Sequence, residues 1–63
     1  MKALIHKIHD LFDADATVIV TLTYGMVEKG KITGVDFRMM ALEKDDGSVK
    51  TMALSKIEDI CNG

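Results

Sequence analysis

The sequence predicts a mainly β protein in which one N-terminal α-helix leads into a five-stranded, strongly bent antiparallel barrel. Three observations indicate this fold class. Apolar residues change from helical to alternating spacing at residue 17, turn-forming residues separate five short alternating segments, and glycines interrupt the second segment. At 63 residues the chain has room for one domain. We expect it to span residues 1–63, with the helix at about 2–12 and the barrel at about 16–60.

The helix is predicted from an apolar stripe near the N-terminus. Its members recur three and four positions apart, which gathers them on one face of a helix; they are Leu4, Ile5, Ile8, Leu11 and Phe12. The acidic segment Asp13-Ala14-Asp15 follows, and negative charge is unfavourable at the C-terminal end of a helix. We therefore expect the helix to end before this segment.

The strands are predicted from alternation between apolar and polar residues, which begins at Thr17. Val18, Val20, Leu22 and Tyr24 fall on one side of the first strand, and the valines and the leucine would face inward. Glycines inside the second segment are expected where a sheet bulges or bends. The Asp46-Gly47 pair is typical of a tight hairpin turn. The further strands are predicted at residues 26–35, 38–44, 49–54 and 57–60.

Self-association is the expected support for so small a core. A domain of this size buries only about 60% of the surface that its unfolded chain exposes, and small domains usually add disulfides, a metal or a partner subunit. Cys61 is the only cysteine, and with His6 and His9 it makes no zinc-binding pattern. We therefore expect a homo-oligomer that has no metal and no cofactor.

Charge and hydropathy favour a protein of the cytoplasm. The net charge of −2 provides no overall attraction for nucleic acid, so such binding needs a local group of positive side chains. No apolar run approaches the roughly 18 residues of a membrane-spanning helix. The basic N-terminus lacks the long apolar stretch of a signal peptide. A cytoplasmic location and no membrane partner are the resulting expectations.

Residues 18–36 combine an alternating strand, two glycines and an aspartate in the pattern Val18-x-Val20-x-Leu22-x-x-Gly25-x-x-x-x-Gly30-x-Ile32-x-x-Val35-Asp36. This pattern resembles the first motif of the Sm-like (LSm/Hfq-like) small β-barrel family, and the resemblance covers about residues 4–60. It implies an Sm-like barrel, a homo-oligomer such as a ring, and binding of single-stranded RNA. It also implies that Gly25 and Gly30 shape the bent sheet and that Asp36 organises the following loop.

The Sm-like register places the loop after Asp36 beside the turn before the last strand, which predicts an RNA-binding set of Phe37, Arg38 and Lys56. Arg38 stands where the family usually has a residue that stacks on a base, and a guanidinium plane can stack. Met40 stands where many members have a base-reading asparagine and cannot form its hydrogen bonds. We therefore expect weak or non-specific RNA binding. In the alternative interpretation, Phe37 packs on neighbouring loops and the two charges are only solvated.

The predicted oligomer interface lies on the last two strands. Exposed strand edges present unpaired backbone groups that pair readily with another chain. Pairing across subunits would then assemble the ring that the resemblance implies. The residues assigned to this interface are Met52, Ala53, Leu54, Ile57 and Ile60.

A weaker resemblance implies a different partner. The ending Gly47-x-x-Lys50-x-Met52-x-Leu54-x-x-Ile57-x-x-Ile60 is similar to the barrel of YolD-like proteins, a bacterial and phage group. It implies a protein-binding regulatory module of SH3-like or YolD-like type, with no nucleic-acid role. An enzyme is not expected, because the sequence offers neither a nucleophile paired with a base nor a metal-binding set.

Overall fold

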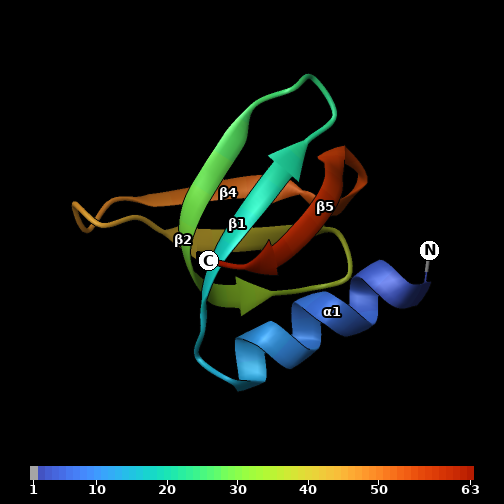
Figure 1. Ribbon diagram of the computed structural model, residues 1–63, viewed down its shortest axis with the longest axis horizontal. Helices are drawn as coiled ribbons and strands as arrows, with labels where there is room; N and C mark the ends of the chain where they lie inside the picture. Colours follow the sequence, from blue (N-terminus) through green and yellow to red (C-terminus); the bar gives the residue numbers. More distant parts are fainter. Residues whose placement is uncertain (1) are drawn as a thin grey trace.

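The protein consists of one α-helix followed by five antiparallel strands, which confirms the fold class expected from the sequence (Figure 1). The structure is a computed structural model and describes residues 2–63. The predicted element ends differ from the observed ones by at most two residues. The elements are α1 (Lys2–Asp13), β1 (Thr17–Leu22), β2 (Val27–Val35), β3 (Met39–Glu43), β4 (Val49–Ala53), the 3-10 helix η1 (Leu54–Lys56) and β5 (Ile57–Asn62).

The strands form one sheet in the order β4-β3-β2-β1-β5, and every neighbouring pair is antiparallel. Within residues 2–63, β4 and β5 do not pair with each other, so the sheet is bent but not closed into a barrel. The 3-10 helix η1 joins the two strands, with extended backbone on either side. The backbone N–H of Thr23 donates to the carbonyl of Lys56 (2.9 Å), which holds the start of β5 beside β1.

The sheet bends where its hydrogen-bonding register shifts. One shift lies between Ile32 and Gly34, where β2 pairs with β3, and another lies between Thr21 and Leu22, where β1 pairs with β5. Such a bulge inserts a residue into one strand and increases its twist and bend. The two shifts curl one face of the sheet around the core, as the curved paths of β1 and β2 show (Figure 1).

Gly30 and Gly25 occupy backbone positions that favour glycine. A Cβ atom on Gly30 would lie 2.3 Å from the backbone oxygen of Glu43, so a side chain there would force β2 and β3 apart. Gly25 has φ +83° in the turn after β1, a conformation that strains L side chains. Gly30 therefore allows β2 and β3 to approach closely, and Gly25 allows the chain to reverse direction after β1.

The core lies between the inner face of the sheet and α1. Val18, Val20 and Leu22 point inward and are at most 1% exposed, as the alternation predicts. Tyr24 does not continue this row. The N–H of Leu22 donates to the carbonyl of Met26 (2.8 Å), which ends β1 and leaves Tyr24 61% exposed in the turn. The other buried apolar side chains are Ile8, Ile32, Met40, Leu42, Met52, Ile57 and Ile60.

Helix α1 lies across one end of the bent sheet and packs against β2 and β5 (Figure 1). Ile8 anchors it, with no exposed surface. An ion pair joins Lys7 to Asp59 (3.0 Å), but both side chains are largely exposed, and exposed pairs contribute little to stability. Apolar packing therefore holds the helix. Neither α1 nor any other helix in the described part of the chain is long and apolar enough to cross a membrane.

Replacing Gly30 with alanine is expected to lower the free energy of unfolding by about 1–3 kcal/mol, the usual cost of overpacking. The new methyl group would meet the backbone oxygen of Glu43, which cannot move independently of β3. Urea unfolding followed by circular dichroism measures this change.

Gly34→Ala is the matched control for Gly30→Ala, because it changes the same strand at a position where an added Cβ meets nothing within 4 Å. The free energy of unfolding of the control should stay within about 0.5 kcal/mol of the wild-type value or rise slightly. Equal losses in the two variants would contradict a specific close approach at Gly30.

Candidate nucleic-acid interface

The loop that joins β2 to β3 is folded by the side chain of Asp36. Its Oδ1 accepts hydrogen bonds from the backbone N–H groups of Arg38 and Met39, both at 2.7 Å. The N–H of Asp36 donates in turn to the carbonyl of Met39 (2.9 Å). The amides of Arg38 and Met39 favour the ionised carboxylate and hold the pKa of Asp36 below its ordinary value. The loop is thus fixed by an aspartate turn, with residue 37 at its tip.

Phe37 projects from this loop and is 87% exposed. The guanidinium carbon of Arg38 lies 5.8 Å from the centre of the Phe37 ring, which is within the range of a cation–π contact. The pair presents an open aromatic face beside a positive charge. Single-stranded nucleic acids are bound by this combination, because bases stack on the ring and phosphates attract the cation.

The loop lies against the turn that precedes β5, in the arrangement that the Sm-like register predicts. The backbone N–H of Leu54 donates to the carbonyl of Arg38 (2.8 Å). An open hollow of about 430 Å³ lies between the loop and η1, lined by Phe37, Arg38, Met39, Ala53, Leu54 and Ser55. Lys56 is the next residue after Ser55 in η1; it is exposed but does not line the hollow. Phe37 and Arg38 are therefore in contact, and Lys56 lies to one side.

Met40 has no exposed surface and points into the core from β3. The position at which many Sm-like proteins carry a base-reading asparagine therefore faces away from the hollow in this chain. Neither its thioether nor its orientation suits hydrogen bonding to a base edge.

The residues assigned to the oligomer interface lie at the two ends of the sheet order, where β4 and β5 each have one neighbour within the chain. Met52, Ile57 and Ile60 are at most 6% exposed, because their side chains belong to the chain's own core. Ala53 and Leu54 are half-buried. What these two segments offer a second copy is mainly backbone rather than apolar side chains.

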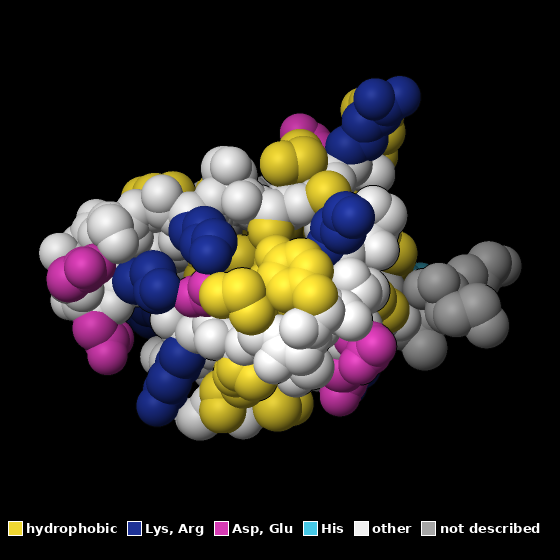
Figure 2. Space-filling view, turned by 90° about the horizontal axis from the view of Figure 1, so that it is seen from above, with side chains coloured by type: hydrophobic (Ala, Val, Ile, Leu, Met, Phe, Trp, Pro, Cys, Tyr) yellow, Lys and Arg dark blue, Asp and Glu magenta, His cyan; other side chains and the backbone are white. Residues whose placement is uncertain are grey.

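A second group of exposed side chains surrounds the turn between β1 and β2 and was not assigned a role from the sequence. Tyr24 and Met26 in this turn are 61% and 48% exposed. Figure 2 looks onto this end of the molecule and shows hydrophobic side chains near the middle, with lysine or arginine side chains on either side. The group is separate from Phe37, although the hydrogen bond from Thr23 to the Lys56 carbonyl brings η1 close to its edge.

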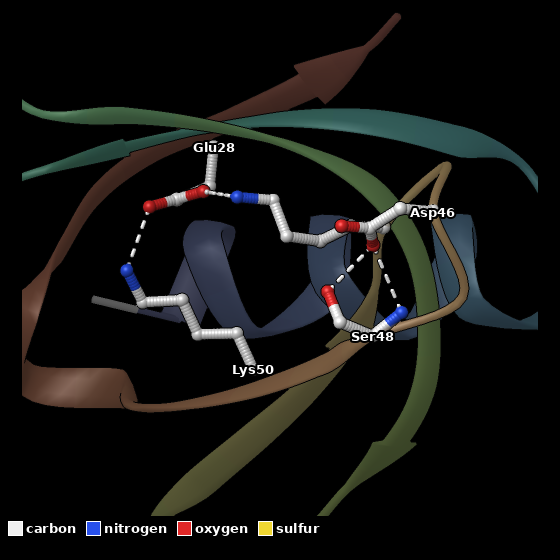
Figure 3. A network of polar contacts seen from close by, with 5 residues as sticks. Glu28, Asp46, Ser48 and Lys50 are labelled. Carbon is white, nitrogen blue, oxygen red and sulfur yellow. Dashed lines mark hydrogen bonds and ion pairs between the residues drawn. The ribbon is translucent and has the colours of Figure 1, made fainter.

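Glu28 is the one charged residue among the buried residues of the described chain, and its carboxylate faces Lys50 (Figure 3). Its side chain is 6% exposed and accepts hydrogen bonds from the Nζ atoms of Lys44 (2.6 Å) and Lys50 (2.7 Å). The hydrogen bond from Lys44, followed in size by the one from Lys50, lowers the pKa of Glu28 below its ordinary value. Burial acts in the opposite direction and raises this pKa. The burial of Glu28 could have been predicted from the strand register, because Glu28 lies on the same side of β2 as the inward-facing Gly30 and Ile32.

No metal site is evident in residues 2–63. His6 and His9 are exposed on α1, and no three or more histidine, cysteine, aspartate or glutamate side chains of the described residues gather to hold an ion.

Comparison with known proteins shows an Sm-like fold. The chain is similar to a crystal structure of Hfq, described as a pleiotropic translational regulator, with a TM-score of 0.84. The similarity covers 97% of this chain and 91% of that one, at 16% sequence identity. No family model matches the sequence, and no curated protein matches it. The resemblance in residues 18–36 is thus confirmed for the fold.

Replacing Glu28 with glutamine is expected to lower the free energy of unfolding by about 1–2 kcal/mol at pH 7. The amide loses charge-assisted hydrogen bonds to two lysines that are themselves half-exposed. Because the folded protein lowers the pKa of Glu28 below 4.5, this stabilisation is complete above pH 4.5 and is lost as the pH falls through the folded pKa.

Urea unfolding of the wild type and of Glu28→Gln at a series of pH values tests this dependence. The two stabilities should converge in acid. Glu43→Gln, which removes an exposed carboxylate from β3, is the control and should unfold like the wild type at pH 7. A difference for Glu28→Gln that does not change with pH would rule out the proposed role of its ionised carboxylate.

Proposed function

We propose that this chain is an oligomeric Sm-like binding module that binds single-stranded RNA weakly and with little base preference. The single observation that carries the proposal is the Phe37–Arg38 pair, held outward by the Asp36 turn beside η1. Residues 1–63 would act as one Sm-like domain, and an RNA-binding role agrees with the cytoplasmic location expected from the sequence.

Each residue of the set has a distinct part in this proposal. Phe37 stacks on a base, since its ring is almost entirely accessible. Arg38 adds its guanidinium plane and a permanent positive charge to the same stack. Lys56 attracts phosphate from the neighbouring turn as a mobile point charge. With Met40 buried, no group at that position reads base identity, which agrees with binding that depends little on sequence.

Assembly would compensate for the weakness of one site. The chain has a net charge of −2, and a single Arg–Lys pair gives little attraction for a polyanion. Several copies would place identical sites along one strand, so that the second and later contacts form within the complex and raise overall affinity. The proposed function therefore needs both the local patch and the oligomer.

The free edges of β4 and β5 support the proposed assembly. They differ in sequence, so pairing β4 of one copy with β5 of the next gives a head-to-tail contact that closes if its rotation completes a ring. Lys50 on β4 already pairs with Glu28, and Asp59 on β5 already pairs with Lys7, so the proposed assembly relies on the backbone of the two edges rather than on charge.

The double variant Arg38→Ala with Lys56→Ala is expected to bind U-rich and A-rich oligonucleotides about tenfold more weakly than the wild type. Loss of two cations should also reduce the slope of log affinity against log salt by about 1.4, because each phosphate contact on a single strand contributes about 0.7. Fluorescence anisotropy across a range of salt concentrations measures both effects.

Lys29→Ala with Lys31→Ala provides the charge-matched control for the RNA experiment. Both lysines are exposed on β2 and lie outside the Phe37 loop, so their loss should leave affinity and salt slope close to wild type. If the two double variants weaken binding equally, the attraction is general charge, and the assigned site is wrong.

The mass of the protein in solution is expected to be a multiple of 6.9 kDa at micromolar concentration. Unpaired β4 and β5 edges are the physical reason, since backbone groups on a free edge gain partners when another strand adds. Light scattering coupled to size exclusion, with absorbance at 260 and 280 nm, gives the mass and any retained RNA. A constant mass of 6.9 kDa up to millimolar concentration would exclude this assembly.

A further inference from the structure

Glu28 is a buried carboxylate that the RNA-binding site does not use, and one of its bonds joins two strands that are not neighbours in the sheet. Glu28 lies on β2 and Lys50 lies on β4, with β3 between them in the strand order. The Nζ atom of Lys50 donates to Oε2 of Glu28 at 2.7 Å. Figure 3 shows the two side chains pointing toward each other from their strands. This bond therefore crosses the inner face of the curled sheet and passes over β3.

The register of the sheet shows how far this bond reaches. Lys50 stands opposite Leu42 on β3, and Leu42 stands opposite Ile32 on β2. Glu28 precedes Ile32 on the same strand by a stretch of about 13 Å of extended backbone. The bond from Lys50 thus attaches β4 to a part of β2 that strand pairing does not connect to it.

Two side chains of the edge strand β4 reach the rest of the molecule across the inner face. Met52, near the C-terminal end of the strand, is buried in the core. Lys50, near the N-terminal end, is half-exposed and bonds to Glu28. Val49 and Thr51 alternate with these two residues and are exposed. Apolar packing therefore holds one end of β4, and the Glu28 carboxylate holds the other.

The end of β4 that Glu28 holds adjoins the β3–β4 turn, which extends beyond the other strands (Figure 1). The turn is fixed internally, because Oδ1 of Asp46 accepts hydrogen bonds from the backbone N–H and the hydroxyl of Ser48. These local bonds keep the shape of the turn but do not fix the angle at which it leaves the sheet. Segments with few buried contacts open locally at a low cost in free energy. The bond from Lys50 to Glu28 limits such opening.

From this geometry we propose that Glu28 is a positioning residue for assembly, which acts through Lys50 to hold the free edge of β4 in place for pairing with β5 of a second copy. This inference rests on the edge-to-edge assembly proposed above and identifies the contact that prepares one of the two edges. An edge that is already fixed loses less conformational entropy when a strand adds to it, so the same backbone pairing gives a tighter assembly. Lys50 itself need not touch the second copy.

The concentration at which the oligomer dissociates, measured by light scattering on a dilution series at pH 7, tests the proposal. Lys50→Gln removes the bond that attaches β4 to Glu28. This variant is expected to dissociate at a concentration about tenfold higher than the wild type, because the edge must then be ordered during association. Circular dichroism checks that each variant remains folded under these conditions.

Lys44→Gln is the matched control for Lys50→Gln, because it also removes one lysine hydrogen bond from the Glu28 carboxylate. Lys44 follows β3, however, and β3 is already held to β2 by strand pairing that extends to Lys31 and Glu43. The free energy of unfolding should fall by similar amounts in the two variants. The dissociation concentration of Lys44→Gln should nevertheless stay within about twofold of the wild-type value.

Amide hydrogen exchange of residues 49–51 separates positioning from direct contact with the second copy. In the dissociated protein, these amides should exchange faster in Lys50→Gln than in the wild type or in Lys44→Gln, because the attachment of β4 to β2 is lost before any second copy is present.

Three results would overturn the assignment. The first is an oligomer that Lys50→Gln weakens no more than Lys44→Gln does, which would leave Glu28 with a general role in stability. The second is weaker assembly of Lys50→Gln without faster amide exchange, which would place Lys50 in the contact itself. The third is a wild type that stays at 6.9 kDa at every concentration, which would remove the proposed assembly as well. The first two results leave the proposed assembly standing, so the two failures are distinguishable.

Discussion

The inward packing of Val18, Val20 and Leu22 is the interaction on which the rest of the structure depends. β1 lies between β2 and β5, so its buried side chains hold both neighbours against one core. The sheet bends around that core at the register shifts, and Gly30 allows β2 to approach β3 closely. Without this inward row, the bend would have nothing to enclose, and the loops at its ends would not meet.

The candidate site is a product of one local turn and of the pairing of β3 with β4. Asp36 fixes the shape of its own loop through two short backbone hydrogen bonds, an effect confined to neighbouring residues. The hydrogen bond between Arg38 and Leu54 continues the antiparallel pairing of β3 with β4, in which Met39 lies opposite Ala53. Local chemistry thus orients Phe37, and tertiary structure brings η1 beside it.

The sequence predicts the elements well because helix and strand have different periods. The apolar residues around Ile8 follow the helical period, and the inward residues of β1 follow the strand period. The motif from Val18 to Asp36 identifies the Sm-like fold. Three features depend on information that alternation does not contain. Closure depends on whether β4 pairs with β5, exposure of Tyr24 depends on where β1 ends, and Glu28 is charged at an inward position where alternation predicts an apolar residue.

The two free edges of the sheet have a consequence for contacts between copies of the molecule. Within residues 2–63, β4 and β5 stand at opposite ends of the strand order and do not pair with each other. An assembly built from contacts between unlike edges closes into a ring only when the rotation between successive copies completes a full turn. Otherwise it extends as a filament. Glu58 and Asp59 place carboxylates on β5, and charged side chains on natural edge strands discourage indiscriminate pairing with other chains.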